Sequence, residues 1–307
     1  MSLFLLPFLR HVALLEEHSN KESSYELGHN QFSDMSLEEF HALFKLGKKN
    51  TRPIPKIDTA DQEIATKIAR SLQSLDLPDY VNWVQIGAVT PIKNQGACGA
   101  CWAFSTTGAL EGAKFIKTGE LVSLSEQNLL DCDHTDMGCS GGLMDSAFKF
   151  DEKTGGLCSE TDYPYEAIQH DDCDTSCVDV PGTIVKTFVD VPPGDERALL
   201  SALAMQPISV AIQADQFAFQ FYRRGVLDDD SCGKSAQIDH GVLAVGYGTD
   251  LETQTPYWLV KNSWGESVST TVLWCQNETK KYNGDESLDA RLLFVSLFVS
   301  FRSESVV

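Results

Sequence analysis

Nine cysteines narrow the range of folds open to this chain. Seven of the nine lie between Cys98 and Cys177 in a sequence of 307 residues. Such a density is typical of proteins that fold in an oxidising compartment, where most cysteines form disulfides. Because nine is an odd number, complete pairing of the others still leaves one thiol free. We therefore expect a disulfide-linked globular domain with one cysteine available for chemistry.

The stretch QGACGACWAFS (residues 95–105) contains two cysteines three positions apart, Cys98 and Cys101. A redox pair usually has a tryptophan before it and a proline inside it, whereas here Trp102 follows and Gly-Ala lies between. A zinc site needs four ligands, and no second C-x-x-C or spaced histidine pair follows. We therefore expect no metal and no cofactor. The remaining interpretation is one structural sulfur beside one reactive sulfur, with Cys101 activated at the start of a helix.

A nucleophilic thiol needs a base, and the base needs a group that orients it. His240 in QIDHGVLAVGYG and Asn262 in YWLVKNSWG supply both residue types. Each lies at the end of an apolar, strand-like run, where a polar side chain is held rigidly and can face a cleft.

Together, QGACGACWAFS, DHGVLAVGYG and KNSWG resemble the papain-like cysteine peptidases, a family that includes the cathepsins. The resemblance implies a two-lobed α+β fold with a helical left lobe and a β-barrel-like right lobe. The residue pattern agrees, because a helix is expected from Cys101 to about Lys117 and strands follow later. The expected strands are residues 182–191, 208–213, 241–247 and 257–261.

The resemblance also implies the catalytic roles. Cys101 would attack a peptide carbonyl, and His240 would form a thiolate–imidazolium pair with it. Asn262 would hold the other nitrogen of the ring, and Trp264 would shield that bond from water. Gln95 would complete an oxyanion hole with the backbone N–H of Cys101.

The turn CSGGLMD (residues 139–145) lies where related enzymes bind the substrate backbone. Its glycines would let an extended peptide approach. An apolar pocket would then accept the second substrate residue before the cut, and the Leu-Met pair resembles the cathepsin L branch. The expected substrate-binding residues are Gly141, Gly142, Leu143, Met144, Ile238, Asp239 and Trp264.

In the family, Cys98 would pair with Cys139 of the G-C-x-G-G turn. Cys132 would pair with Cys173 or with Cys177, and the sequence does not decide between them, although we take Cys173 as the partner. Cys158 would then be left with the other of these two. The partners of Cys232 and Cys275 stay open.

Upstream, GHNQFSD (residues 28–34) resembles the G-x-N-x-F-x-D signature of an inhibitory prosegment. Residues 1–47 are therefore expected to form a partial, helical prosegment, with a capping box at Ser36 and Glu39. Residues 48–76 would cross the cleft as a linker. Acid would trigger release, since carboxylates such as Asp34 lose their charge there.

The peptidase domain is expected to span residues 77–267, because the family pattern breaks after Ser267. Its closing strands would be missing, and residues 268–307 would form an atypical tail whose segment 292–301 could cover the open edge as a strand. The first hypothesis is a cysteine endopeptidase zymogen acting on protein or peptide substrates. The alternative is a catalytically impaired homologue that binds peptides or peptidases.

Composition restricts the partners. A formal net charge of −20 argues against nucleic-acid binding. No apolar run approaches the roughly 20 residues of a membrane span. The first ten residues lack the cationic start and cleavage site of a signal peptide. The family and its disulfides suggest a lysosomal, vacuolar or extracellular monomer.

Overall fold

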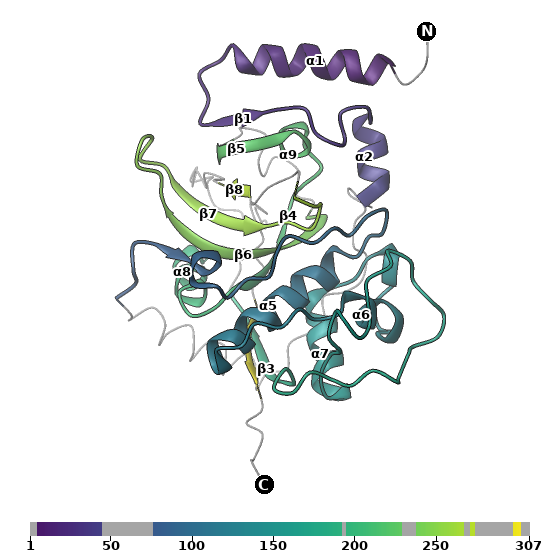
Figure 1. Cartoon of the computed structure of the whole chain (residues 1–307). Coiled ribbons are helices and arrows are strands. Elements are labelled where there is room, and N and C mark those ends of the chain that lie inside the picture. The colour runs from purple at the N-terminus through teal and green to yellow at the C-terminus, as the bar shows by residue number, and fades with distance from the viewer. Residues whose placement is uncertain are drawn as a thin grey trace, which may run out of the picture.

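The chain folds into helices and strands, and the strands form one mixed sheet (Figure 1). The computed structural model describes residues 5–44, 76–191, 195–228, 238–266, 271–273 and 297–301. The helices are α1 (Leu5–Ser19), α2 (Leu37–Phe44), α4 (Trp83–Ile86), α5 (Cys101–Thr118), α6 (Glu126–Cys132), the 3₁₀ helix η1 (Gly138–Ser140), α7 (Met144–Thr154), α8 (Glu196–Leu203) and α9 (Phe217–Gln220). The strands are β1 (Tyr25–Leu27), β2 (Val81–Asn82), β3 (Val185–Asp190), β4 (Ile208–Ile212), β5 (Tyr222–Leu227), β6 (His240–Thr249), β7 (Pro256–Lys261), β8 (Thr271–Leu273) and β9 (Leu297–Phe301).

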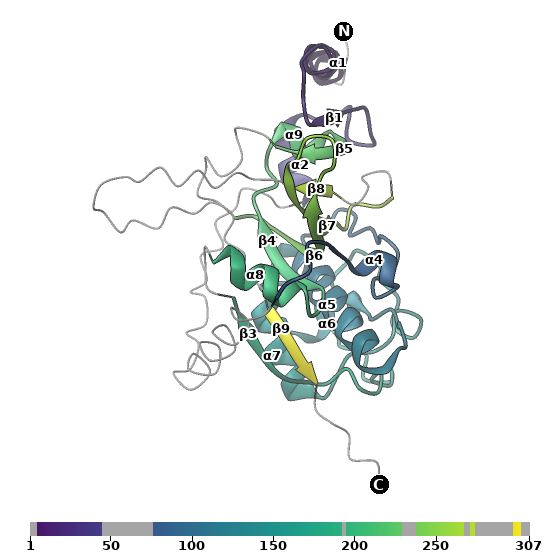
Figure 2. The same ribbon diagram turned by 90° about the vertical axis from the view of Figure 1, so that its left-hand side faces the viewer.

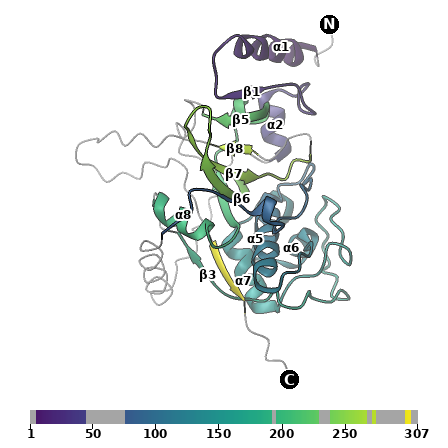
Figure 3. The same cartoon turned by 60° about the vertical axis from the view of Figure 1, so that its left-hand side comes forward.

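Helix α5 forms the centre of the helical part and lies directly against the sheet (Figures 1 and 3). Two glycines one turn apart permit this close approach. A Cβ at Gly108 would lie 2.8 Å from Leu243 Cδ2, and one at Gly112 would lie 2.6 Å from Pro207 Cγ. Ser105 strengthens the contact, since its Oγ donates to Val242 O at 2.7 Å. The middle of α5 is thereby held against the sheet.

The strands form one sheet in the order β1-β5-β8-β7-β6-β4-β9-β3, with β2 added beside β6. Strands β4 and β7 flank β6 in antiparallel register, with Ile212 opposite His240 and Val260 opposite Ala244. The four strands expected from the sequence are present as β3, β4, β6 and β7. The end strands of this order, β1 and β3, do not pair, so the described part of the sheet is open rather than a closed barrel.

The C-terminal tail contributes two strands to the sheet. β8 lies between β5 and β7, and β9 lies between β4 and β3. The sequence suggested that the domain ends at residue 267 without closing strands. The structure instead places residues 271–273 and 297–301 on strand edges, where their backbones satisfy N–H and C=O groups that would otherwise remain unpaired.

The N-terminal segment, by which we mean residues 5–44, lies at one end of the sheet (Figure 2). It contains α1 and α2, but residues 25–27 form β1 and pair with β5, so the expectation of an all-helical segment was incomplete. The capping box is confirmed. Ser36 N donates to Glu39 Oε2 at 2.8 Å, and Glu39 N donates to Ser36 Oγ at 3.2 Å. In the described part of the chain, no helix has the length and apolar character needed to cross a membrane.

Two carboxylates and one lysine lie where α7 packs on β3. Burial raises the pKa of Asp190 to about 7, and the nearby Asp145 adds to this effect while Lys149 opposes it. Burial also raises the pKa of Asp145. The Oδ1 atom of Asp190 is buried and has no hydrogen-bond partner. At neutral pH this carboxyl group therefore weakens the fold when it ionises.

Replacing Asp190 by asparagine should raise the free energy of unfolding at pH 8 by about 1–2 kcal/mol more than it does at pH 5. The folded state keeps its proton up to about pH 7, whereas an unfolded aspartate loses it near pH 4. The stabilising proton is thus fully present below pH 4 and is lost as the pH rises through 7. Urea unfolding at both pH values measures the effect, with the exposed Glu252→Gln as control. An equal gain at pH 5 and pH 8 would contradict this explanation.

Candidate active site

Cys101 is the first residue of α5, and among the cysteines in the described ranges it alone is unpaired. Its neighbour Cys98 forms a disulfide with Cys139 with an S–S distance of 2.07 Å. Gly99 N also donates to Cys139 O at 2.9 Å. One sulfur of the C-x-x-C pair thus anchors the loop, while the other stays free at the N-terminus of a helix.

His240 is the first residue of β6 and is 2% exposed. Its Nε2 lies 2.8 Å from Asn262 Oδ1. The same oxygen accepts a hydrogen bond from Ser263 N at 2.7 Å, so it acts as an acceptor and Nε2 must carry the proton. Trp264 stacks on the imidazole with ring centroids 4.8 Å apart. In the neutral ring, Nδ1 therefore holds the free lone pair.

The start of β6 lies against the start of α5. A Cβ at Gly241 would lie 3.3 Å from Cys101 O and 3.2 Å from Met144 Sδ. The backbone N–H groups of Gly241 and Trp102 point at the Cys101 thiol and favour its ionised form. His240 Nδ1, however, is buried without a hydrogen-bond partner. The structure thus brings the two elements together without a thiol–imidazole hydrogen bond.

Both groups are neutral in this state. Desolvation raises the pKa of the Cys101 thiol to about 11, against the opposing effect of the N–H donors. Desolvation lowers the pKa of His240 to about 4, although its bond to Asn262 opposes the shift. Burial disfavours the charged form of each group. The expected thiolate–imidazolium pair is therefore not the form that this enclosed environment favours.

Gln95 joins the two halves of the site through four hydrogen bonds. Its Nε2 donates to Cys98 O at 2.9 Å, and its Oε1 accepts from Ser263 Oγ at 2.7 Å. Its backbone N donates to Ser263 O at 2.8 Å, and its carbonyl accepts from Tyr165 OH at 2.8 Å. A side-chain amide has two N–H donors, so one remains beyond the bond to Cys98.

The predicted substrate turn contains two different glycines. Gly141 has φ +113° and open space where a Cβ would lie. At Gly142 a Cβ would lie 2.5 Å from Trp102 Cδ2, so the backbone touches the tryptophan. Leu143 is half-buried and donates its N–H to Asp136 Oδ1 at 3.0 Å.

The other predicted substrate residues differ in their accessibility. Met144 is buried at the start of α7 and faces Gly241. Ile238 is half-buried just before β6. The carboxylate of Asp239 accepts a hydrogen bond from Ala214 N at 2.8 Å. Trp264 is fully buried, so it offers no surface to a substrate in this state.

Aromatic rings of the N-terminal segment cover Trp264. The ring centroids of Phe32, Phe40 and Phe44 lie 6.1, 5.2 and 4.6 Å from that of Trp264. Gln31 Nε2 also donates to Trp264 O at 2.8 Å. The segment thus closes the side of the indole that the His240 ring does not occupy, and it excludes water from this part of the site.

Two further disulfides crosslink the helical part. The structure pairs Cys132 with Cys173, the choice that the sequence left open, and Cys158 with Cys177. Cys232 and Cys275 lie outside the described residues.

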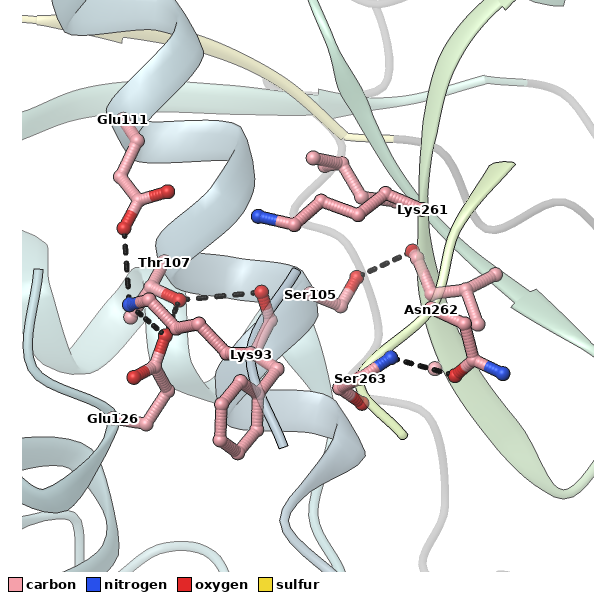
Figure 4. A pocket seen from close by; sticks show the side chains of 12 residues that line it. Lys93, Ser105, Thr107, Glu111, Glu126, Lys261, Asn262 and Ser263 are labelled. Carbon is pink, nitrogen blue, oxygen red and sulfur yellow. Dashed lines mark hydrogen bonds and ion pairs between the residues drawn. The ribbon is translucent and has the colours of Figure 1, made fainter. Parts of the chain in front are cut away.

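Sequence reasoning missed a buried ionic cluster beside the site (Figure 4). Lys93 Nζ lies 3.2 Å from Glu111 Oε1 and 2.7 Å from Glu126 Oε1. Thr90 Oγ1 donates to Glu111 Oε2 at 2.6 Å and accepts from Lys261 Nζ at 2.9 Å. The only sequence signal is a lone glutamate inside an apolar helix. Because Lys261 precedes Asn262, the cluster anchors the residue that orients His240.

Burial and neighbouring charges shift the pKa values of the two carboxyl groups in this cluster in opposite directions. Burial raises the pKa of Glu126 to about 7, although Lys93 opposes this shift. Burial would also raise the pKa of Glu111, but Lys93 and Lys261 lower it overall. Glu111 is thus the charged partner that both lysines depend on.

Comparison with known proteins identifies the family. Residues 77–282 match the family described as "Papain family cysteine protease". The probable cysteine protease RD21B of Arabidopsis thaliana is 46% identical over 259 residues, which cover 84% of this chain and 53% of that protein. A cathepsin L-like peptidase of Aedes aegypti is 47% identical over 247 residues, covering 80% of this chain and 71% of that protein. The proform of the Amb a 11 cysteine protease, a ragweed pollen allergen, has a TM-score of 0.79 and 33% identity, covering 97% of this chain and 88% of that one.

The fold and the sequence are those of the papain type. This chain belongs to the papain family of cysteine proteases. The two-lobed α+β fold is confirmed by the similarity to a proform structure. The family match extends past residue 267, into the tail. The chain spans about half the length of RD21B, 53% of that protein.

Proposed function

We propose that this chain is the latent precursor of a cysteine endopeptidase in which Cys101 is the nucleophile and His240 the general base. One observation carries the proposal. The free thiol at the start of α5 lies against the start of β6, whose first residue is a histidine oriented by Asn262. Residues 1–47 act as prosegment, 48–76 as linker and 77–267 as the main peptidase domain, to whose sheet the tail, residues 268–307, adds β8 and β9.

The chemistry follows from the free lone pair on His240 Nδ1. When the N-terminal segment leaves, water and substrate reach the site, and Nδ1 takes the proton of the Cys101 thiol. The thiolate attacks the peptide carbonyl carbon, and the oxyanion accepts hydrogen bonds from Cys101 N–H and the Gln95 amide. The imidazolium then gives its proton to the leaving amine. A water molecule, deprotonated by His240, hydrolyses the resulting thioester and regenerates the thiol.

Specificity is proposed to reside in the turn before α7. Gly141, with open space at its Cβ position, would let an extended substrate backbone approach and form strand-like hydrogen bonds. Gly142, Leu143, Met144 and Ile238 would then form the apolar pocket for the second residue before the cut. Asp239 would hold the pocket wall through its bond to Ala214. The described residues give no support to an impaired, purely binding homologue.

Latency has a physical cause in the same environment. With the N-terminal segment in place, His240 is buried behind Trp264 and Cys101 is half-buried, and desolvation disfavours the charged form of both groups. Removing Phe32, Phe40 and Phe44 from Trp264 admits water, which lowers the cost of separating charge. Three disulfides fit folding in an oxidising compartment, so we propose a lysosomal, vacuolar or extracellular location.

Active-site trapping tests the proposal. The full chain is incubated at acid pH and then treated with a peptidyl epoxide that alkylates the nucleophile of active cysteine peptidases. Mass spectrometry should find the adduct on Cys101 in the processed protein and no adduct before processing. His240→Ala should prevent labelling. A processed, folded protein that leaves Cys101 unlabelled would overturn the assignment.

Replacing Gln95 by alanine should lower kcat/KM by about 100- to 1000-fold, because one oxyanion donor is lost. The change should fall mainly on kcat, since the donor binds the oxyanion more strongly than the ground-state carbonyl. Steady-state kinetics on a short peptide substrate measures it. Gln95 is buried, so urea unfolding of each variant serves as control. A loss confined to KM would show that Gln95 only shapes the binding surface.

A further inference from the structure

The N-terminal segment occupies an edge of the catalytic sheet. β1 pairs with β5 in antiparallel register, with Glu26 opposite Arg224, and β8 occupies the other side of β5. Gly28 N donates to Phe221 O at 2.9 Å, and Val226 N donates to Ser24 O at 2.8 Å. When the segment leaves, Val226 N in β5 and Phe221 O just before it lose these partners. An edge strand with unpaired backbone groups is a template for another extended chain.

The edge is shaped for close contact with a backbone. A Cβ at Gly225 would lie 2.4 Å from Ser24 O and 2.7 Å from Tyr25 Cα. A Cβ at Gly28 would lie 3.0 Å from the Cδ atom of Arg223. Gly225 thus permits an incoming strand to approach at this position, and any side chain there would block it.

The charge of the edge is opposite to that of the whole chain. The protein carries a formal net charge of −20. β5 nevertheless presents two adjacent arginines, and Arg224 forms an ion pair with Glu26 in which both side chains are about half exposed or more. Arg223 also favours the ionised form of Glu26. An acidic side chain is therefore the complement of this position.

The path of the N-terminal segment connects this edge with the active site. Four residues after β1, Gln31 bonds to Trp264 O, and Trp264 stacks on His240. Asn30 Nδ2 donates to Gln220 O at 2.7 Å on the way. A chain that pairs with β5 in the same direction is thus led to the indole beside the catalytic imidazole within a few residues. A substrate bound along β5 can therefore also reach the catalytic imidazole.

We propose that, once the N-terminal segment has left, the β5 edge binds an acidic, extended segment of a protein substrate by strand addition, with a carboxylate opposite Arg224. This inference rests on the proposed peptidase function, because it assumes release of the segment and turnover of a substrate. Backbone hydrogen bonds supply affinity, and the arginine pair selects acidic sequences. Short peptides that fill only the cleft do not use the edge.

The probe is a fluorescent peptide with the sequence of residues 21–29 and its Glu26→Lys counterpart. The protein is the full chain, from which the N-terminal segment is removed by self-processing or by pepsin at acid pH. Anisotropy at low salt should show binding of the Glu26 peptide to the processed protein only. Arg224→Glu should weaken binding of the Glu26 peptide by roughly fivefold and strengthen binding of its Glu26→Lys counterpart by roughly fivefold. The preference between the two peptides should thereby reverse.

Two glycine variants distinguish a side chain that blocks the incoming strand from a general effect of backbone strain. Gly225 and Gly119 both have positive φ, but nothing lies within 4 Å of a Cβ at Gly119. Gly225→Ala should reduce binding of both peptides by at least about tenfold, while the matched Gly119→Ala should leave binding unchanged. Equal binding by the two variants would overturn the proposal.

Kinetics distinguishes this inference from the peptidase function itself. Saturating probe should raise the KM for an acidic, unfolded protein substrate and leave cleavage of a short peptide unchanged. Equal inhibition of both substrates would mean that the probe blocks the cleft and would overturn the docking edge. Probe binding to a processed protein that cleaves nothing and takes no epoxide would refute the peptidase function while supporting strand addition at β5.

Discussion

Cys101→Ser should abolish peptide hydrolysis, with kcat falling by roughly a million-fold. The hydroxyl is too weak an acid for His240 to ionise it efficiently, and the variant lacks the only free thiol among the described residues. Since the variant cannot process itself, its N-terminal segment is removed with pepsin before assay. Hydrolysis of a short peptide with an apolar second residue is then measured against the wild-type protein.

The control keeps the reactive sulfur and removes the structural one. Cys98→Ser combined with Cys139→Ser deletes the adjacent disulfide. We expect a loss of about 2–4 kcal/mol in the free energy of unfolding, with hydrolysis retained below the lowered melting temperature. If the double variant lost catalysis as completely as Cys101→Ser while still folded, the two sulfurs would act together as a redox pair.

Glu111→Gln should lower the free energy of unfolding by about 3–5 kcal/mol. The change leaves Lys93 and Lys261 with Glu126 as their only carboxylate in the cluster, and both lysines are largely enclosed between the helices and the sheet. Glu126 does not replace Glu111, because burial disfavours its charged form and one carboxylate cannot neutralise two ammonium groups. Urea unfolding at pH 7 measures the effect.

The matched control removes a carboxylate from an exposed pair. Glu17 and Lys21 form an ion pair in α1 in which both side chains are 63% exposed. Glu17→Gln should change stability by no more than about 0.5 kcal/mol. If the two variants were equally destabilised, burial would not be the cause. If Glu111→Gln lost hydrolysis at urea concentrations at which it is still folded, this would further show that Lys261 positions Asn262.

Local chemistry allowed much of the site to be predicted from sequence. Cys101 starts α5 directly after a glycine-containing loop, a boundary that the sequence shows. His240 and Asn262 lie at strand ends because β6 and β7 are apolar runs. The capping box at Ser36 needs only residues three positions apart. Such features depend on short segments, which a sequence displays directly.

Features that depend on distant contacts were not predictable in the same way. The partners of Lys93 come from α5 and α6, and nothing in their spacing shows that they meet. Residues 25–27 form a strand only because β5 offers an edge. The neutral state of Cys101 and His240 arises from burial in the assembled fold, whereas the motifs alone predict an ion pair.

The pH dependence of Cys101 alkylation tests the central claim most directly, namely that His240 ionises this thiol once the N-terminal segment is gone. Iodoacetamide labelling is followed by mass spectrometry between pH 3 and pH 9, before and after processing. Before processing the reaction should stay slow throughout, since the thiol pKa is about 11. After processing it should become fast above roughly pH 4, as for a thiolate–imidazolium pair, and His240→Ala should lose this fast phase. A processed protein whose Cys101 reacts no faster, or reacts equally fast without His240, would contradict the account.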